Sequence, residues 1–459
     1  MNKSTSSHWP PSPTNQVSEA ATATLEPPAP EATPGEIQRS LFFIAYAAFI
    51  TTLAQDKVLG NLPIKLWLKN HLHVTPPELA GFLFWSGLAW YAKPIFGLVV
   101  DAFPLLGTRR RSYMILSAIL AAASWIVVSL GQGSYGTFLG GTILLGVFMV
   151  FGSTIMGALL VEAGQKYGAT GRVSAVREVV QNGCFIITGP IGGWLAGRAF
   201  GLTAGIGAGL LLSLAAVAYV YLPEKPVARR NEHVWADAGK QLKIVFASRT
   251  LWAAAGLIVL FFFSPGFTTP LLYRQQNMLH FSDQFLGTLT LVDGIALVAG
   301  GALYGLICRR FNLRSLLLVG IVCYGGSALL YLGYHPNQNG AIEIEILAYF
   351  LQGVGVLPLY DLATRATPRG GEGMGYALMM SARNIALFGA DWVGSKLLQT
   401  YHLPWDTLVW MNAGTTFVCL LLVPFLPGVL MRKREGEDMG DARATGEQIS
   451  GIEPGQHAP

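Results

Sequence analysis

The chain has 459 residues, of which 52% are hydrophobic and 12% are charged, and its formal net charge is +5. Ordinary soluble domains carry roughly 25% charged residues, so this composition excludes them and indicates a polytopic membrane protein. Lys and Arg gather in particular loops rather than on one basic face, which argues against nucleic acid as a partner. The length suits about twelve spanning helices of roughly 20 residues each.

No enzyme or cofactor pattern stands out in the sequence. The chain has neither a Walker loop nor a serine–histidine or zinc-hydrolase motif, so we predict no ATP-driven step and no catalytic site. The His71 and His73 pair lacks further ligands for a metal. Cysteines are scattered through apolar segments without ligand spacing, and we interpret them as small buried hydrophobic residues; they are Cys184, Cys308, Cys323 and Cys419.

The N-terminal part predicts a tail and six spanning helices. Residues 1–36 are rich in Pro, Ser, Thr, Ala and Glu, which predicts a disordered cytoplasmic tail without the features of a signal peptide. Residues 37–222 form the first half. We expect the first helix to start near Gln38 and end at the NLP break from Asn61, followed by a short amphipathic piece. Further spans are expected near 78–102, 112–130, 135–165, after Arg172, and at 202–222.

A basic polar stretch separates two similar halves. Residues 223–249 predict a cytoplasmic linker, residues 250–431 a second set of six helices, and residues 432–459 a disordered cytoplasmic tail. The expected spans are 250–278, 283–308, 314–334, 342–366, 372–400 and 405–431. Short local matches suggest an internal duplication, since Gly97 in GLVVDAF corresponds to Gly305 in GLICRRF. Parallel six-helix repeats bind substrate between the halves.

The segment KPIFGLVVDAFPLLGTRRRSY, from Lys93 to Tyr113, orients the chain. Charges are expensive at bilayer depth, and short loops rich in Lys and Arg stay cytoplasmic. The same rule places both termini in the cytoplasm of a cell-membrane protein. This loop resembles the signature between the second and third helices of major facilitator transporters, and the matching residues of this predicted gating loop are Gly97, Asp101, Arg109, Arg110 and Arg111.

A narrower resemblance covers most of residues 41–400. The segments GNLPIKLWLKNHL and TPPELAGFLFWSGLAWYAKPIFGLVVDAF, together with TPRGGEGMGYALMMSARNIALFGADWVGSKLL, are similar to the folate-biopterin transporter family. That resemblance implies an all-α fold of twelve transmembrane helices in two six-helix halves, and secondary transport of a folate or pterin. The chain departs from the family pattern at Gly157, where an Asp is usual, and at Gln55–Asp56 in the first helix. These departures leave the substrate open.

Ionisable groups inside the spans are the candidates for substrate binding or coupling, because burying them is expensive. Asp56 is either a proton-coupling carboxylate, a partner for Lys93, or half of an interfacial pair with Lys57. Lys93 is either functional or a snorkelling lysine packed on the gating loop. The candidates in this predicted set are Asp56, Lys93, Asp293, Arg383, Asn384 and Asp391.

Two of these candidates lie deep in the second half. Asp293 is near the middle of the eighth span and is a candidate for coupling or binding. Arg383 could hold a carboxylate or a pterin edge through paired hydrogen bonds. The alternative is a structural ion pair from Arg383 to Asp293 or Asp391. The rings of Trp85, Trp90 and Trp392 suit stacking on a flat heterocycle, or an ordinary interfacial position.

Charged residues near the inner helix ends suggest a second functional element, at the cytoplasmic end of the protein. We expect a cytoplasmic network of ion pairs that closes when the transporter faces outward, together with Asp101 and the three arginines of the gating loop. Its members share a similar depth and are Glu162, Arg177, Glu178, Asp361 and Arg365.

The sequence therefore predicts a monomeric secondary transporter of a small anionic organic solute, with folate or a pterin first and protons as the coupling ion. A muropeptide or other organic-anion facilitator is the alternative in the same class. A non-transporting membrane receptor is the alternative from another class, and it would need a soluble output domain. The tail after Arg434 is short and polar, which disfavours a receptor.

Overall fold

The computed structural model describes residues 34–431 apart from 106, 109, 167–169, 223–233, 309, 335–336 and 369. Within these residues the fold is all α-helical, with one isolated bridge from Leu105 to Thr108 around Gly107, which has a positive φ. The first helix begins at Pro34, within the last residues of the predicted N-terminal tail. A proline is well tolerated at the first helical position. Residues 1–33 and 432–459 lie outside the described residues.

The first group of helices runs up to Tyr221. Its elements are α1 (Pro34–Leu53), α2 (Asn61–His71), α3 (Pro76–Ser86), α4 (Leu88–Tyr91), α5 (Lys93–Ala102), α6 (Arg111–Leu130), α7 (Tyr135–Lys166), α8 (Thr170–Ala196) and α9 (Phe200–Tyr221), with a 3-10 turn η1 at Gly131–Gly133.

The second group follows α10 (Val234–Ala247), which lies in the predicted linker. Its elements are α11 (Arg249–Phe262), α12 (Thr268–Asn277), α13 (Asp283–Ile307), α14 (Leu313–Leu329), α15 (Gln338–Ala366), α16 (Glu372–Gln399), α17 (Trp405–Leu422) and α18 (Gly428–Met431), with 3-10 turns η2 at Leu330–Gly333 and η3 at Val423–Phe425.

The first helix ends at Leu53, earlier than the break expected at Asn61, and the stretch expected as a short amphipathic piece is helix α2. Pro63, Ile64, Leu66 and Leu68 are buried on α2, which explains why this sequence folds back into the bundle. Turns at residues 54–60 separate α1 from α2. A Cβ at Gly60 would lie 2.7 Å from the Asp56 carbonyl oxygen, so the break needs glycine there.

Two other predicted spans are broken as well. The second becomes α3, α4 and α5, starting at a capping box in which Glu78 accepts the Thr75 backbone N–H at 2.7 Å. The seventh becomes α11 and α12. Counting each broken set as one segment, the described helices give six segments before α10 and six after it. Seven described helices are individually long and apolar enough to cross a membrane, or up to eight if α10 and α11, bent by 74°, are one span.

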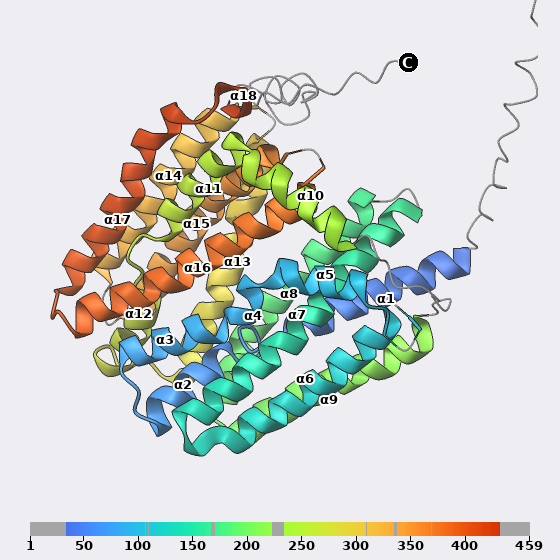
Figure 1. Ribbon diagram of the computed structural model, residues 1–459. Helices are drawn as coiled ribbons and strands as arrows, with labels where there is room; N and C mark the ends of the chain where they lie inside the picture. Colours follow the sequence, from blue (N-terminus) through green and yellow to red (C-terminus); the bar gives the residue numbers. More distant parts are fainter. Residues whose placement is uncertain are drawn as a thin grey trace, which may run out of the picture.

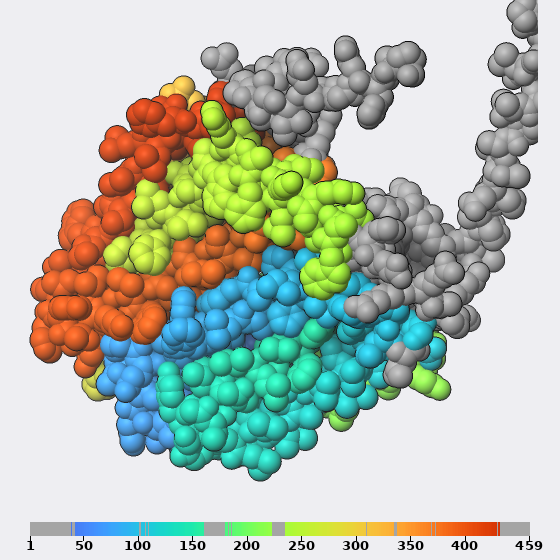
Figure 2. Space-filling model, in the orientation of Figure 1, coloured from blue at the N-terminus to red at the C-terminus, as the bar shows by residue number. Residues whose placement is uncertain are grey.

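Two helix bundles meet along α8 with α13 and along α3 with α16 (Figure 1). They converge at the end that holds the α2–α3 turn and α12, which we call the narrow end. They diverge toward the end that holds α10 and α18, which we call the wide end. Figure 2 shows α10 lying across both bundles at the wide end.

Glycines allow the close approach at the narrow end. A Cβ at Gly287 of α13 would lie 2.6 Å from the Gly189 carbonyl oxygen of α8, and one at Gly193 would lie 2.9 Å from the Gly287 Cα. Small residues of this kind let helix backbones touch within a bilayer. The narrow end of the interface is therefore packed backbone against backbone.

Candidate functional site

Arg383 on α16 is a half-buried cation between two aromatic rings. Its guanidinium carbon lies 4.5 Å from the Phe262 ring centre and 5.8 Å from that of Tyr360. Its Nη1 donates to the Asn384 side-chain oxygen at 2.8 Å. Its Nε is buried, and among the described residues it has no hydrogen-bond partner. A planar cation with an unused donor and flanking rings can bind a flat anionic group.

The predicted alternative of an ion pair from Arg383 to Asp293 or Asp391 is wrong. In the described part of the chain, no carboxylate oxygen of either residue lies within 4.0 Å of a guanidinium nitrogen of Arg383. Asp391 has another partner, and Asp293 belongs to a separate polar cluster described below. Arg383 therefore keeps its charge next to aromatic rings rather than next to a carboxylate.

Asp391 holds the broken seventh segment in place. Its Oδ1 accepts the backbone N–H of Thr269 at 2.9 Å, and its Oδ2 accepts the Thr269 hydroxyl at 2.5 Å. These bonds lie in the first turn of α12, where backbone N–H groups have no partner within the helix. The neighbouring Gly266 N–H donates to the Ala390 carbonyl oxygen at 2.9 Å. The structure thus gives Asp391 an anchoring position.

Asp56 and Lys57 lie at the break between α1 and α2. Asp56 is 4% exposed, and its Oδ1 has no hydrogen-bond partner in the described residues. The Lys57 ammonium lies 3.8 Å from the Phe388 ring centre on α16 and 3.4 Å from the Leu83 carbonyl oxygen. Lys57 therefore contacts the second bundle, and Asp56 is buried beside it.

Lys93 begins α5 and points toward α7. Its Nζ donates to the Ser153 hydroxyl at 3.0 Å and lies 5.4 Å from the Trp90 ring centre. The side chain is half-buried. Lys93 is thus placed inside the first bundle, near the broken second segment.

Sequence reasoning missed two ionisable residues, the half-buried Lys65 and the buried Glu345. Lys65 lies in the stretch expected as a short amphipathic piece outside the spans, and on α2 it interacts electrostatically with Asp391 and Lys57. Glu345 lies inside the predicted span 342–366, where its charge within an apolar run was an available signal. It is 2% exposed.

Glu345 is the centre of a hydrogen-bonded cluster in the second bundle. It accepts the Tyr331 hydroxyl at 2.6 Å, the Tyr334 hydroxyl at 2.8 Å and the Gln275 amide at 3.3 Å. Asp293 on α13 interacts electrostatically with Glu345, and its Oδ1 is buried without a hydrogen-bond partner in the described residues. Two carboxyl groups, one on α13 and one on α15, therefore act on each other electrostatically.

The predicted gating loop is described only in part. Gly97 lies on α5, where an added Cβ would be 3.7 Å from Thr154 of α7. Asp101 ends α5, but its side chain lies outside the described residues, as does Arg109. Arg110 precedes α6. Arg111 donates to the Tyr219 carbonyl oxygen at 2.8 Å and lies 4.8 Å from the Tyr219 ring centre, so it binds the end of α9.

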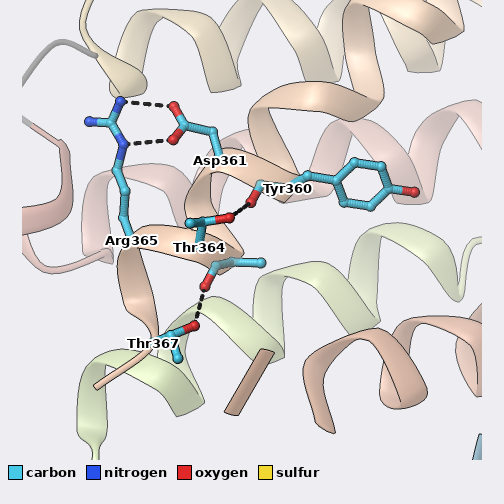
Figure 3. Close-up of polar contacts among 6 residues, drawn as sticks. Tyr360, Asp361, Thr364, Arg365 and Thr367 are labelled. Carbon is cyan, nitrogen blue, oxygen red and sulfur yellow. Dashed lines mark hydrogen bonds and ion pairs between the residues drawn. The ribbon is translucent and has the colours of Figure 1, made fainter. Parts of the chain in front are cut away.

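The predicted cytoplasmic network contributes one described ion pair. Arg365 binds Asp361 through two bonds of 2.8 Å, both residues lying on α15 (Figure 3). The Arg365 side chain is 8% exposed, so the pair is largely buried. The side chains of Glu162, Arg177 and Glu178 lie outside the described residues.

Two of the tryptophans proposed to stack on a substrate, Trp85 and Trp392, pack against other aromatic side chains. The Trp392 ring stacks on Phe84 at 5.5 Å and meets Trp85 edge-on at 6.2 Å, which places Trp392 between the two bundles. A cavity of about 480 Å³ opens nearby at the narrow end, and its lining includes Tyr273, Arg274 and Trp405. Among the described residues no group of three or more His, Cys, Asp or Glu could hold a metal ion.

Comparison with known families bears on this arrangement. A family model described as the BT1 family matches residues 56–446, which is most of the chain. The chain belongs to the BT1 family. The resemblance to folate-biopterin transporters is therefore confirmed at the level of the family.

Curated relatives of this BT1-family chain cover most of its length. It is 28% identical over 392 residues to the folate-biopterin transporter of a Synechocystis species, covering 80% of this chain and 78% of the relative. It is 23% identical over 398 residues to folate transporter 1 of Plasmodium falciparum, and the match covers 83% of this chain and 77% of that relative.

Solved structures confirm the fold of this BT1-family chain. A point mutant of the nucleoside transporter NupG superposes with a TM-score of 0.69 at 12% identity, covering 84% of this chain and 99% of that one. A D-xylose-proton symporter superposes with a TM-score of 0.60 at 13% identity, and the match covers 85% of this chain and 97% of the symporter. The predicted major facilitator fold, all α-helical and polytopic, is confirmed.

Proposed function

We propose that this BT1-family chain is a secondary transporter that carries folate or another pterin across a membrane by alternating access, coupled to protons. The curated relatives bear the names of folate and folate-biopterin transporters, which supports transport rather than catalysis. The observation that carries the substrate class is Arg383, a cation with an unused Nε between Phe262 and Tyr360. Flat anionic heterocycles suit that geometry.

An anionic substrate is supported by the cations along the interface between the bundles. Lys57 reaches the second bundle, and Lys65 on α2 interacts with Asp391 on α16. Together with Arg383 and Lys93, they place positive charge on both sides of the route between the halves. Ionisable groups are kept at this depth in membrane proteins mainly for function.

The orientation follows from charge placement. Arg110 precedes α6, Arg111 begins it, and Arg365 lies in the last turn of α15, so basic residues gather at these helix ends. By the positive-inside rule we propose that this wide end is cytoplasmic and that both termini lie inside. We also propose that the protein lies in the cell membrane and acts as a monomer. In that orientation the described conformation is closed at its outer end and diverges inward. We propose that Asp101, Asp361 and their neighbours close the inner end in the opposite state.

The proton would bind a carboxyl group within the spans. Asp56 is one candidate, because its buried Oδ1 has no partner among the described residues and Lys57 contacts the opposite bundle. Binding of a proton on one side and its release after the bundles rock is the general scheme for such symport.

The test is uptake of labelled folate and biopterin into proteoliposomes, with and without an inward proton gradient. We expect saturable, gradient-stimulated uptake of at least one ligand, lost in Arg383→Ala. The matched control is Arg198→Ala, because Arg198 is exposed just after the end of α8 and packs on the Trp194 ring of that helix. It should transport like the wild type.

Two results would count against the proposal. A folded protein that takes up neither ligand would remove the pterin assignment, and a screen of muropeptides and other organic anions would follow. Equal uptake by Arg383→Ala and the wild type would remove Arg383 from the binding site while leaving transport in place.

A further inference from the structure

The Glu345 cluster is a buried acid site whose hydrogen bonds all come from neutral donors. Two phenol hydroxyls and one amide reach the carboxylate, and in the described residues no Lys, Arg or His nitrogen lies within 4.0 Å of it. Asp293 on the neighbouring helix α13 acts on it electrostatically, and in the described residues the buried Asp293 Oδ1 has no hydrogen-bond partner. Two ionised carboxylates without a cation repel each other, and one proton bound by the pair relieves that repulsion.

The cluster is built into the same segment that closes the narrow end. Gln275 of α12 donates to both Glu345 and the Tyr334 hydroxyl, the second bond being 2.9 Å long. On the same helix, the Tyr273 hydroxyl donates to the Val74 carbonyl oxygen of the first bundle. Lys69 of α2 lies 5.3 Å from the Tyr273 ring centre. The position of α12 therefore depends on contacts in both bundles.

Protonation would change what Glu345 can accept. Ionised, its Oε1 accepts Tyr334 and Gln275, while its Oε2 accepts Tyr331. A protonated carboxyl has no charge and one acceptor position fewer, so the hydrogen bonds that it accepts from these three donors weaken. Gln275 makes the longest of the three bonds and is the donor that links the cluster to α12.

We propose that Glu345 and Asp293 together form one proton-binding site, and that its occupancy controls whether α12 keeps its contact with Val74. The unprotonated site holds the narrow end closed. A single proton, taken up from solution on a carboxyl oxygen and released unchanged, loosens Gln275 and allows this end to open. This proton site rests on the proposed function for its role in transport, although its effect on α12 is independent of any substrate.

The other polar groups that act on Glu345 and Asp293 are an amide and several phenols. α12 contributes the neutral Gln275, while the remaining groups that act on the two carboxyls are phenols. They are Tyr331 of η2, Tyr334 just after η2, and Tyr349 of α15. Tyr324 of α14 acts electrostatically on Tyr349 and is itself acted on by Arg383. Phenols titrate near pH 10, so the carboxyl groups are the ones that change charge at lower pH.

The experiment measures the opening of the narrow end against pH without substrate. Spin labels are placed at Asn70→Cys on α2 and Gln399→Cys on α16, both exposed, after replacement of the four native cysteines. In the otherwise unaltered sequence the distance between the labels should lengthen on acidification. In Glu345→Gln this pH response should disappear. The matched control is Glu343→Gln, because Glu343 lies on the same helix but outside the cluster, and its response should be retained.

Two further variants keep the test decisive. Asp293→Asn removes one negative charge, so the pH response should move to lower pH. Tyr273→Phe removes the bond to Val74, so the narrow end should open at every pH. A pH response in Glu345→Gln equal to that of the unaltered protein would overturn the proposal, as would an unshifted response in Asp293→Asn if Glu345→Gln does not fold. Absence of pterin uptake alongside a Glu345-dependent response would overturn only the proposed substrate.

Discussion

The carboxylate of Asp391 on α16 binds both the backbone N–H and the hydroxyl of Thr269, at 2.9 and 2.5 Å, in the first turn of α12. This pair joins two segments that are far apart in the sequence, and it supplies an acceptor for a helix N-terminus inside the bundle. A negative charge there is also favoured by the helix dipole.

The first prediction concerns this anchor. Asp391→Asn removes the charge and one acceptor, so we expect the protein to be less stable by about 1–2 kcal/mol, the usual range for losing a helix cap. Thermal unfolding in detergent would measure the loss. Asp406→Asn is the control, because Asp406 is exposed in the first turn of α17. Unfolding of Asp391→Asn at the wild-type temperature would contradict the anchoring position.

The glycine contact at the narrow end gives a second prediction. A methyl group at Gly287 would lie 2.6 Å from the Gly189 carbonyl oxygen, so Gly287→Ala should disfavour closure. Overpacking of this kind costs about 1–3 kcal/mol. The equilibrium constant for opening the narrow end should therefore rise roughly 5-fold to 150-fold. Distance measurements between labels at Asn70 and Gln399 would report it. Gly205→Ala is the control, since an added Cβ there meets no atom within 4 Å; similar behaviour of the two variants would argue against the contact.

The aromatic flank of Arg383 supports a third prediction. Phe262→Leu removes the ring that lies 4.5 Å from the guanidinium carbon. Cation–π contacts are worth about 0.5–2 kcal/mol, so KM for the transported anion should rise roughly 2-fold to 30-fold with a smaller change in maximal rate. Concentration-dependent uptake in proteoliposomes would measure both constants. Phe425→Leu should leave KM unchanged because Phe425 is 84% exposed; an unchanged KM in Phe262→Leu would exclude the ring from substrate binding.

A fourth prediction tests the break in the first segment. The buried Trp125 of α6 donates its Nε1 hydrogen to the Ala54 carbonyl oxygen at 3.0 Å. Trp125→Phe leaves that carbonyl without its donor, which should lower stability by about 1–3 kcal/mol. Thermal unfolding compared with Trp410→Phe, at a position 58% exposed, would isolate the effect of the bond. Equal unfolding temperatures for the two variants would show that the Trp125 bond does not stabilise the break.

Much of the fold was predictable because hydrophobic runs and loop charges are local properties of a sequence. The composition and the apolar runs predicted an all-α membrane protein of the major facilitator class, and the comparisons confirm it. The break at Gly266 was not predictable from those runs, and the break expected at Asn61 begins earlier, after Leu53. Burial of Pro63, Ile64, Leu66 and Leu68 makes α2 part of the first bundle, which its two lysines did not indicate.

By itself, the sequence determined which charged residues lie within apolar spans, and Arg383, Asp293 and Asp391 were found in that way. Only the tertiary structure decided their partners, because those partners come from distant segments. Asp391 accepts a hydrogen bond from Thr269, which is 122 residues away in the sequence, and Glu345 accepts one from Gln275, which is 70 residues away. A buried charge is stabilised by the polar groups that helix packing places next to it, and these groups become neighbours only when the helices assemble.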